Sequence, residues 1–229
     1  MRVGAVLLGR LSSARLPGKV LTEVAGRPLA AHVLARVEQV DGIDGVVFAT
    51  SHNAGDDPIA EWATGAGIGV FRGSLHDVRG RVIACAEEHG FDAIARVNAD
   101  SPWIDPELLS RAVVHARNGS HDLVTNVLER TYPYGVSAEV ATVAALRRAE
   151  GLDPGPDAAE HVTETIYTHP EAFSILNLRA EPPVAPGLRL TVDTPADLER
   201  FEALVERFGD RTPRVGTEEL VAALAKLDA

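Results

Sequence analysis

The sequence predicts an α/β fold, in which a mostly parallel central sheet is flanked by helices and carries a small irregular second lobe. Short apolar runs that suit buried strands alternate with stretches of helical periodicity as far as Leu128. Between residues 129 and 186 the alternation loosens, and Pro and Gly interrupt it repeatedly. With 45% hydrophobic residues in a chain of 229, we expect one domain over 1–229, with 129–186 as a lobe within it.

The predicted strands are short apolar runs bounded by turn residues: Val3–Leu8, Gly45–Thr50, Ile68–Phe71, Ala93–Val97, Leu123–Asn126, Phe173–Leu178 and Leu188–Val192. The predicted helices repeat apolar residues every three or four positions: Pro28–Val40, Asp57–Ala66, His76–His89, Pro106–Arg117, Asp157–Thr168, Pro195–Phe208 and Thr217–Leu227. Asp105 precedes one helix as a potential N-cap. The glycines between Gly65 and Gly69 lack dinucleotide-binding spacing and follow a helix, so they predict a helix end and a turn.

Composition excludes several classes of partner. The formal net charge of −11 argues against nucleic acid. No apolar run approaches the roughly 20 residues that a membrane span needs. Met1 and Arg2 lead directly into a strand pattern rather than a signal peptide, and the single cysteine, Cys85, suits a reducing compartment. We therefore expect a cytoplasmic protein with no nucleic-acid or membrane partner.

Cations gather in the loop after the first predicted strand, where Arg10, Arg15 and Lys19 accompany two serines and a Pro-Gly turn. Only one other lysine, Lys226, occurs in the chain. Open α/β sheets bind ligands at the carboxyl ends of their strands, and hydroxyls, backbone N–H groups and cations suit a polyphosphate. The loop is not a P-loop, because the glycine and Ser/Thr positions of that motif are not matched around Ser13 and Lys19.

Two aspartates lie at the ends of predicted strands: Asp193 follows one directly, and Asp100 belongs to the segment Asn98–Pro102 that follows another. A carboxylate at that edge, near a cationic phosphate loop, is well placed to hold Mg²⁺, which takes one or two protein carboxylates and completes its shell with water and phosphate oxygens. The alternative is structural: Asp100 starts a turn, and the segment around Asp193 caps the next helix. Spacing alone leaves both roles open.

Weaker candidates lie elsewhere. Arg72 ends a predicted strand, where it either reads a base or ribose or belongs to an exposed turn. Polar residues of the looser lobe and just beyond it could line a pocket for a second substrate: Tyr132, Tyr134, Glu139, His161 and Arg189. A lone histidine such as His161 is more often packed or solvated than catalytic. Trp62 and Cys85 are expected in the core, and Arg2 and Arg36 on the surface.

Several short motifs occur in one order along the chain. The pattern R-x-x-S-x-R-L-P-G-K runs from Arg10 to Lys19, and weaker motifs follow at Val70–Ser74, Asp100–Pro106, Glu160–Thr163 and Val192–Pro195. Together they resemble the cytidylyltransferases that activate acidic sugars with CTP. The branch most similar is named for spore-coat polysaccharide biosynthesis, and CMP-KDO and CMP-sialic acid synthetases are related to it.

The resemblance implies a GT-A-like fold, Mg²⁺ as cofactor, a homodimer, and transfer of CMP from CTP to an anionic, sugar-acid-like acceptor with release of pyrophosphate. It assigns catalysis to Lys19, Arg15 and Asp100, and metal binding to Asp100 and Asp193. It assigns nucleotide binding to Gly9, Arg10, Ser12, Ser13, Arg15, Lys19, Arg72 and Asn98. From their position in and beside the looser lobe we predict acceptor binding by Arg130, Tyr132, Tyr134, Glu139, His161 and Arg189, with 129–186 as the acceptor and dimerisation lobe.

Three positions depart from the family pattern. Gly9 replaces a glutamine, Ala99 replaces the glycine before Asp100, and Ser137 replaces an acid. Ser137 keeps open an acceptor that is a phosphate, a phosphonate or a cyclitol. A glycosyltransferase has no need of a cation-rich loop for departing pyrophosphate, and the two retained aspartates argue against a binding module without catalysis. We expect Lys19→Ala to lower kcat far more than it lowers stability.

Overall fold

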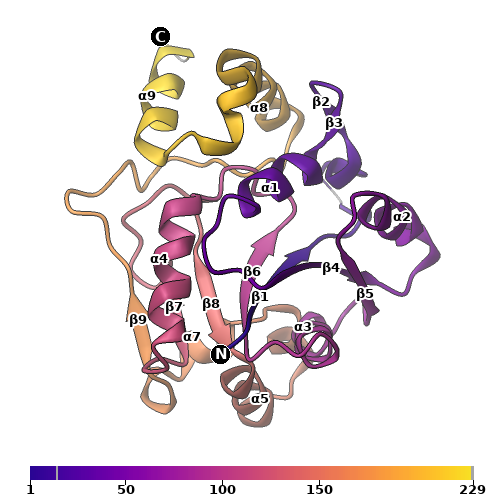
Figure 1. Ribbon diagram of the computed structural model, residues 1–229, viewed down its shortest axis with the longest axis vertical. Helices are drawn as coiled ribbons and strands as arrows, with labels where there is room; N and C mark the ends of the chain where they lie inside the picture. The colour runs from indigo at the N-terminus through magenta and orange to yellow at the C-terminus, as the bar shows by residue number, and fades with distance from the viewer. Residues whose placement is uncertain (14, 228–229) are drawn as a thin grey trace.

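A computed structural model describes residues 1–13 and 15–227; Ala14, inside the loop signature, and residues 228–229 lie outside them. Its centre is a seven-stranded sheet in the order β5-β4-β1-β6-β8-β7-β9 (Figure 1). These strands are β1 (Val3–Leu8), β4 (Gly45–Ser51), β5 (Gly69–Gly73), β6 (Ala93–Asn98), β7 (Leu123–Thr125), β8 (Glu139–Thr142) and β9 (Ile175–Asn177). Strands β2 (Glu23–Val24) and β3 (Arg27–Pro28) form a separate antiparallel pair.

The predicted mostly parallel sheet is confirmed. Strands β5, β4, β1 and β6 pair in parallel, and β7 pairs in parallel with β9. Only β8 runs against its neighbours, β6 and β7. In the register of β1 and β6, Leu8 lies opposite Asn98, so the loop after β1 and the turn after β6 leave the sheet side by side.

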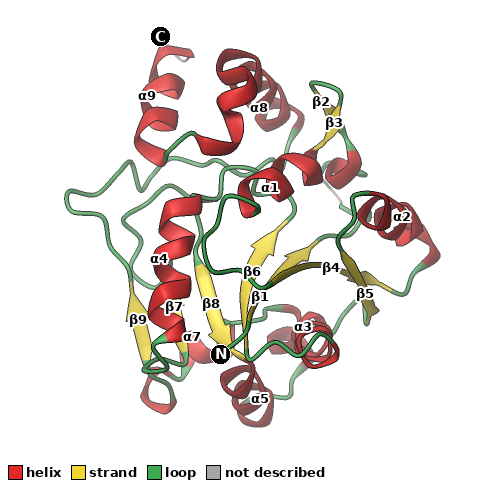
Figure 2. Cartoon of the chain, in the orientation of Figure 1, coloured by secondary structure: helices red, strands yellow, loops and turns green. Residues whose placement is uncertain are grey.

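Helices cover both faces of this sheet (Figure 2). Along β1, Val3, Ala5 and Leu7 belong to one buried cluster, whereas Val6 and Leu8 belong to the other, as the two-residue period of a strand requires. The first cluster includes α1 (Leu29–Val37), α2 (Asp57–Gly65), α4 (Pro106–Arg117), α8 (Pro195–Phe208) and α9 (Thr217–Leu227). The second includes α3 (Val78–Glu88), α5 (Val143–Leu152) and α7 (Glu164–Thr168).

Most predicted elements agree with the structure. The bounds of α4, α8 and α9 match, and the Asp105 carboxylate accepts from the N–H of Leu108 at 3.0 Å as the predicted cap. Helix α2 ends at Gly65 and Gly67 has φ +76°, so the glycine cluster is a helix end and turn. Cys85 is buried, and burial raises the pKa of its thiol to about 12.

Two predicted elements are wrong. The helix expected over Asp157–Thr168 divides into α6 (Pro156–Glu160) and α7, because His161 between them is extended and the hydroxyl of Thr163 bonds to buried Glu139. The strand expected over Leu188–Val192 forms one isolated bridge, between Tyr134 and Arg189. The backbone of this segment forms hydrogen bonds first with Tyr134 and then with Asp100. No single neighbouring strand therefore pairs with it along its length.

Arg36 is also placed differently from the prediction. It is 1% exposed rather than on the surface. Its guanidinium donates to the carbonyls of Ile104, Thr212 and Val215, at 2.6 to 2.7 Å. Burial lowers its pKa to about 10. Arg36 thereby ties α1 to the segment after Asp100 and to the turn η4 (Gly209–Arg214) before α9.

The looser region supplies part of the sheet itself. Strand β8, which no sequence pattern predicted, lies between β6 and β7, and β9 forms an edge. Helix α5, also missed, follows β8 and packs against α3. The short turns η1 (Lys19–Leu21), η2 (Ala54–Asp56) and η3 (Pro170–Ala172) complete the elements of the described chain. None of the helices within residues 1–13 and 15–227 is both long and apolar enough to cross a membrane.

Candidate active site

Two adjoining cavities open where the carboxyl ends of β1 and β6 meet the looser region. The loop cavity, about 490 Å³, is walled by the loop after β1, with Arg10, Ser12, Ser13 and Lys19, and by Arg81 of α3. The lobe cavity, about 370 Å³, is walled by segments 127–139, 161–167 and 189–193. The residues that line both cavities are Arg15, Arg96, Asn98, Asp100, His161 and Asp193.

The loop after β1 is fastened to the neighbouring strand end. The N–H of Leu11 donates to the carboxylate of buried Asp56 at 2.8 Å, and the hydroxyl of Thr50 donates to the carbonyl of Gly9 at 3.0 Å. A Cβ on Gly9 would lie 3.0 Å from Phe48 and 3.1 Å from Ala99, which leaves little room for the glutamine that the family carries there.

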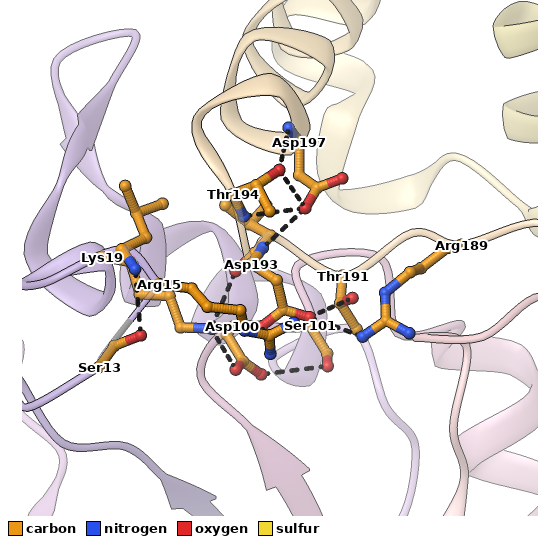
Figure 3. Close-up of polar contacts among 12 residues, drawn as sticks. Ser13, Arg15, Lys19, Asp100, Ser101, Arg189, Thr191, Asp193, Thr194 and Asp197 are labelled. Atoms are coloured by element: carbon orange, nitrogen blue, oxygen red, sulfur yellow. Dashed lines mark hydrogen bonds and ion pairs between the residues drawn. The ribbon is translucent and has the colours of Figure 1, made fainter.

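Lys19 is the centre of the site. It begins η1, directly after Gly18, whose φ of +74° favours glycine. Its Nζ is buried and donates to Asp100 at 2.7 Å, to Asp193 at 2.8 Å and to the carbonyl of Val192 at 3.0 Å (Figure 3). An ammonium group has three donors, so all are used, and Lys19 joins the two candidate aspartates.

Three cationic side chains donate hydrogen bonds to Asp193. Arg15 and Lys19 donate to its Oδ1, and Arg189 and the hydroxyl of Thr191 donate to its Oδ2, all within 2.9 Å (Figure 3). Burial by itself would raise the pKa of this carboxyl, but the bonds from Lys19, Arg189 and Thr191 outweigh it and hold the pKa well below its usual range. Asp193 is therefore an ionised carboxylate at the meeting point of three cations.

Asp100 is more open than Asp193. Its side chain is 31% exposed, against 7% for Asp193. Its Oδ2 accepts from Lys19, whereas the one contact of its Oδ1 within the described part of the chain is 3.4 Å from the hydroxyl of Ser101. Asn98, one strand period earlier, lines both cavities. An open carboxylate oxygen beside cations suits a divalent ion bound together with phosphate oxygens.

In the lobe cavity, two guanidinium groups stack on one aromatic ring. Arg130 and Arg189 have their Cζ atoms 5.0 and 4.2 Å from the centre of the Tyr134 ring. Arg189 also pairs with Asp193, whereas Arg130 has no carboxylate partner among the described residues, and its Nη1 is buried without a hydrogen bond. This combination of a ring face and an unpaired cation suits a polar, anionic ligand.

Glu139 is placed differently from an open ligand-binding carboxylate. It is 4% exposed, and both of its oxygens are occupied. Oε2 accepts from Arg96 at 2.8 Å, and Oε1 accepts from the hydroxyls of Thr163 and Tyr167, each at 2.7 Å. His161 lines both cavities with an exposed side chain 3.9 Å from Glu164.

Two candidates line neither cavity. Arg72 donates to the carboxylate of Asp57 and to the carbonyls of Ser51 and Asn53, so it braces the segment that carries Asp56. Tyr132 is buried against the main core. Direct contact of either side chain with a ligand in these cavities remains a prediction from sequence.

Sequence reasoning missed two arginines of the site, the buried Arg81 and the partly buried Arg96. Arg81 lines the loop cavity from α3, and its Nη1 donates to the carbonyl of Ser74. Arg96 lines both cavities from β6. The available signal for Arg96 was a charge inside an apolar strand, two residues before Asn98 and hence on the same face. Arg81 gave no such signal, because arginine is common on helices.

Comparison with known proteins identifies the family of this chain. The family profile described as cytidylyltransferase matches residues 5–223. The spore coat polysaccharide biosynthesis protein of Bacillus subtilis is 34% identical over 226 residues, which cover 96% of this chain and 92% of that protein.

Solved structures give the same result for the fold. A cytidylyltransferase from Leptospira borgpetersenii superposes with a TM-score of 0.92 at 27% identity, covering 100% of this chain and 95% of that one. A CMP:2-keto-3-deoxy-manno-octonic acid synthetase in complex with CTP superposes at 0.69, with 22% identity over 90% of this chain and 99% of that one. The chain therefore belongs to the cytidylyltransferase family and is a nucleotidyltransferase.

Proposed function

We propose that this enzyme transfers CMP from CTP to an anionic, sugar-acid-like acceptor and releases pyrophosphate. The observation that carries the proposal is the pair of adjoining cavities with a shared wall. One cavity is lined by the cationic loop, and the other holds Arg130, Tyr134 and Arg189. Two substrates bound in them would meet beside Asp100 and Asp193, the geometry that a direct transfer needs.

Relatives support the choice of substrates. One solved structure of the same fold is a CMP:2-keto-3-deoxy-manno-octonic acid synthetase complexed with CTP. A 3-deoxy-manno-octulosonate cytidylyltransferase of Geobacter sulfurreducens is 33% identical over 115 residues. Because those residues cover only 49% of this chain, a sugar acid as the acceptor is part of the proposal. The single cysteine suits a reducing compartment and so supports a cytoplasmic location. The family resemblance supports a homodimer, and both are part of the same proposal.

The site fits Mg²⁺ unequally at its two aspartates. Among the residues that the structure describes, Oδ1 of Asp100 has one weak donor, Ser101 at 3.4 Å, and this oxygen would hold the ion. Asp193 already accepts four hydrogen bonds, so it becomes a ligand only if Arg15 and Lys19 release it. Among the described residues, no three His, Cys, Asp or Glu side chains form a metal cluster, so phosphate oxygens and water would complete the shell. When bound, the ion would neutralise charge on the phosphates.

The cations of the loop serve the leaving group. Arg10, Arg15 and Lys19 lie around the loop cavity, where the β- and γ-phosphates would bind. As the bond to the α-phosphorus breaks, negative charge grows on pyrophosphate, and fixed cations stabilise that charge more than the ground state. Phosphate oxygens would replace Asp193 as the partner of Arg15 and Lys19, so nucleotide binding would change the arrangement of the site.

The test is pyrophosphate release from CTP with Mg²⁺, compared with ATP, GTP and UTP. Each nucleotide is assayed alone and with 3-deoxy-manno-octulosonate, N-acetylneuraminate, a sugar phosphate, a phosphonate and a cyclitol. Release that requires CTP and a sugar acid supports the proposal. Absence of release with every nucleotide and acceptor contradicts it.

A second candidate keeps the chemistry and changes the acceptor to a phosphate, a phosphonate or a cyclitol. Ser137 favours it, because it lines the lobe cavity where the family carries an acid. Without that carboxylate the cavity repels a second anionic group less. Release with the phosphonate, sugar phosphate or cyclitol, and with neither sugar acid, would select this candidate.

A further inference from the structure

The wall between the two cavities is where a transferred group must lie. Three of its side chains carry or can carry a positive charge: Arg15, Arg96 and His161. Arg15 has a side chain that is 61% exposed and comes from the loop, and His161 is 63% exposed. Arg96 is 23% exposed and comes from β6, between β1 and β8 in the sheet. It is the cation of this wall with the most rigid support.

A buried carboxylate holds the guanidinium of Arg96. Its Nη1 donates to Oε2 of Glu139, and Thr163 and Tyr167 donate to the other oxygen of the same carboxylate. Tyr167 also bonds to the hydroxyl of Thr125. Burial and the neighbouring Glu139 raise the pKa of Tyr167, so its phenol stays protonated and remains a donor. Charge-assisted bonds of this kind fix both groups.

Arg96 keeps unused donors after this pairing. Among the described residues, Nη1 is its only guanidinium nitrogen with a hydrogen-bond partner, and Nε is buried without one. Nε has no accessible surface, so Nη2, which is neither buried nor paired among the described residues, is the donor open to a ligand oxygen. A guanidinium keeps its charge at any working pH, and its N–H donors match phosphoryl oxygens.

We propose that Arg96 is a catalytic residue that binds the α-phosphate of CTP during transfer, and that Glu139 is the residue that positions it. This inference rests on the proposed function. In the step, an oxygen of the acceptor forms a bond with the α-phosphorus. The bond from that phosphorus to the bridging oxygen breaks, its electron pair leaves with pyrophosphate, and the hydroxyl proton passes to solvent. Arg96 stabilises the charge on the non-bridging oxygens.

The proposal changes the expected role of Glu139. An acceptor-binding carboxylate would have an oxygen open to the lobe cavity, whereas both oxygens of Glu139 are occupied. Glu139 therefore acts through Arg96. The effects of removing the two residues must then overlap rather than add.

The first test needs no turnover. Arginine side-chain Nε–H signals are recorded by NMR on protein labelled with ¹⁵N-arginine, with and without CTP and Mg²⁺, and Arg96→Lys assigns the Arg96 signal. We expect CTP to shift that signal. If CTP shifts signals of the loop arginines and leaves that of Arg96 in place, the inference is wrong and the proposed function stands. If CTP does not bind at all, both fail.

The second test uses pyrophosphate release with the acceptor that the panel identifies. Arg96→Gln should lower kcat about 100-fold, the usual effect of removing one charge-stabilising donor, while KM for CTP changes by less than about threefold. Glu139→Gln should lower kcat less and have no further effect in the Arg96→Gln background. A further rise in KM for the acceptor in the double variant would contradict the positioning role.

Folding is controlled in two ways. Tyr167→Phe keeps the ring and removes one donor to Glu139, so it tests the same chain of contacts if Glu139→Gln does not fold. The matched control is Arg147→Gln, which breaks an exposed pair with Glu87 between α5 and α3. It should leave kcat and the Arg96 signal unchanged.

Discussion

The two cavities of this enzyme are built in different ways. The loop cavity takes its cations largely from one continuous segment, Arg10 to Lys19, which leaves β1 and is fastened to Thr50 and Asp56. The lobe cavity is assembled from side chains as distant in sequence as Arg15, Arg130 and Arg189. A contiguous loop can be recognised as a sequence motif, whereas the residues that line the lobe cavity come together only after folding. Substitutions should therefore distinguish the role of the loop cavity from that of the lobe cavity.

Lys19→Ala should have the largest effect. It removes a cation from the loop cavity, and it leaves Asp100 and Asp193 without their shared partner. We expect activity to fall at least 1,000-fold. Removing one charge-stabilising group costs roughly 100- to 1,000-fold, and the two aspartates also lose the group that holds them in place. Because breaking a buried ion pair costs about 3–5 kcal/mol, stability should fall substantially as well, whereas the sequence predicts that kcat falls far more than stability.

The measurements for Lys19→Ala are pyrophosphate release and thermal unfolding. Lys226→Ala is the control, because it removes the only other lysine, an exposed residue of α9. A Lys19→Ala enzyme that is active and saturable with CTP would refute the role of the loop cavity.

Asp100→Asn should come next. It keeps the shape of the side chain and removes the charge of the more open aspartate. We expect about a 100-fold lower kcat and a higher requirement for Mg²⁺, with little change in melting temperature. The check is a titration of activity with Mg²⁺, with Asp122→Asn, which affects an exposed pair with Arg148, as control. An unchanged Mg²⁺ dependence would remove Asp100 from the metal site.

Arg130→Gln should separate the cavities most cleanly. Arg130 lines only the lobe cavity and has no ion pair among the described residues. We expect KM for the acceptor to rise about tenfold, the effect of one lost charge-assisted bond, and KM for CTP to stay the same. Arg179→Gln, at the exposed pair with Glu129, is the matched control. Equal changes in both KM values would show that the cavities do not act separately.

The smallest effect concerns pH. The pKa of Asp193 is lowered in the folded protein, while in the unfolded chain it is near 4. The stabilisation from its ion pairs is therefore complete above about pH 4 and is lost as pH falls toward the lowered pKa. Melting temperature, measured from pH 6 to pH 3, should fall by a few degrees less in Asp193→Asn than in the wild type. Parallel curves would contradict this.

Sequence reasoning performed best where local patterns decide structure. Strand β1 and helices α4, α8 and α9 were predicted within their bounds, since buried strands, proline starts and caps such as Asp105 are local signals. It failed at β8, a strand of four residues that pairs with β6 and β7. It also failed at Leu188–Val192, where extended chain bonds to two different neighbours. Pairing between distant segments leaves no local signal.

The same division holds for the site. The motif from Arg10 to Lys19, with Asp100 and Asp193 after apolar runs, was enough to predict which groups gather, because strand ends in a parallel sheet share one edge. Only the tertiary structure decided how they pair. Lys19 is buried between both aspartates, Asp193 holds three cations, and Arg96 is fixed by Glu139. Burial and charge pairing depend on which segments meet in space, and residue order alone does not specify that.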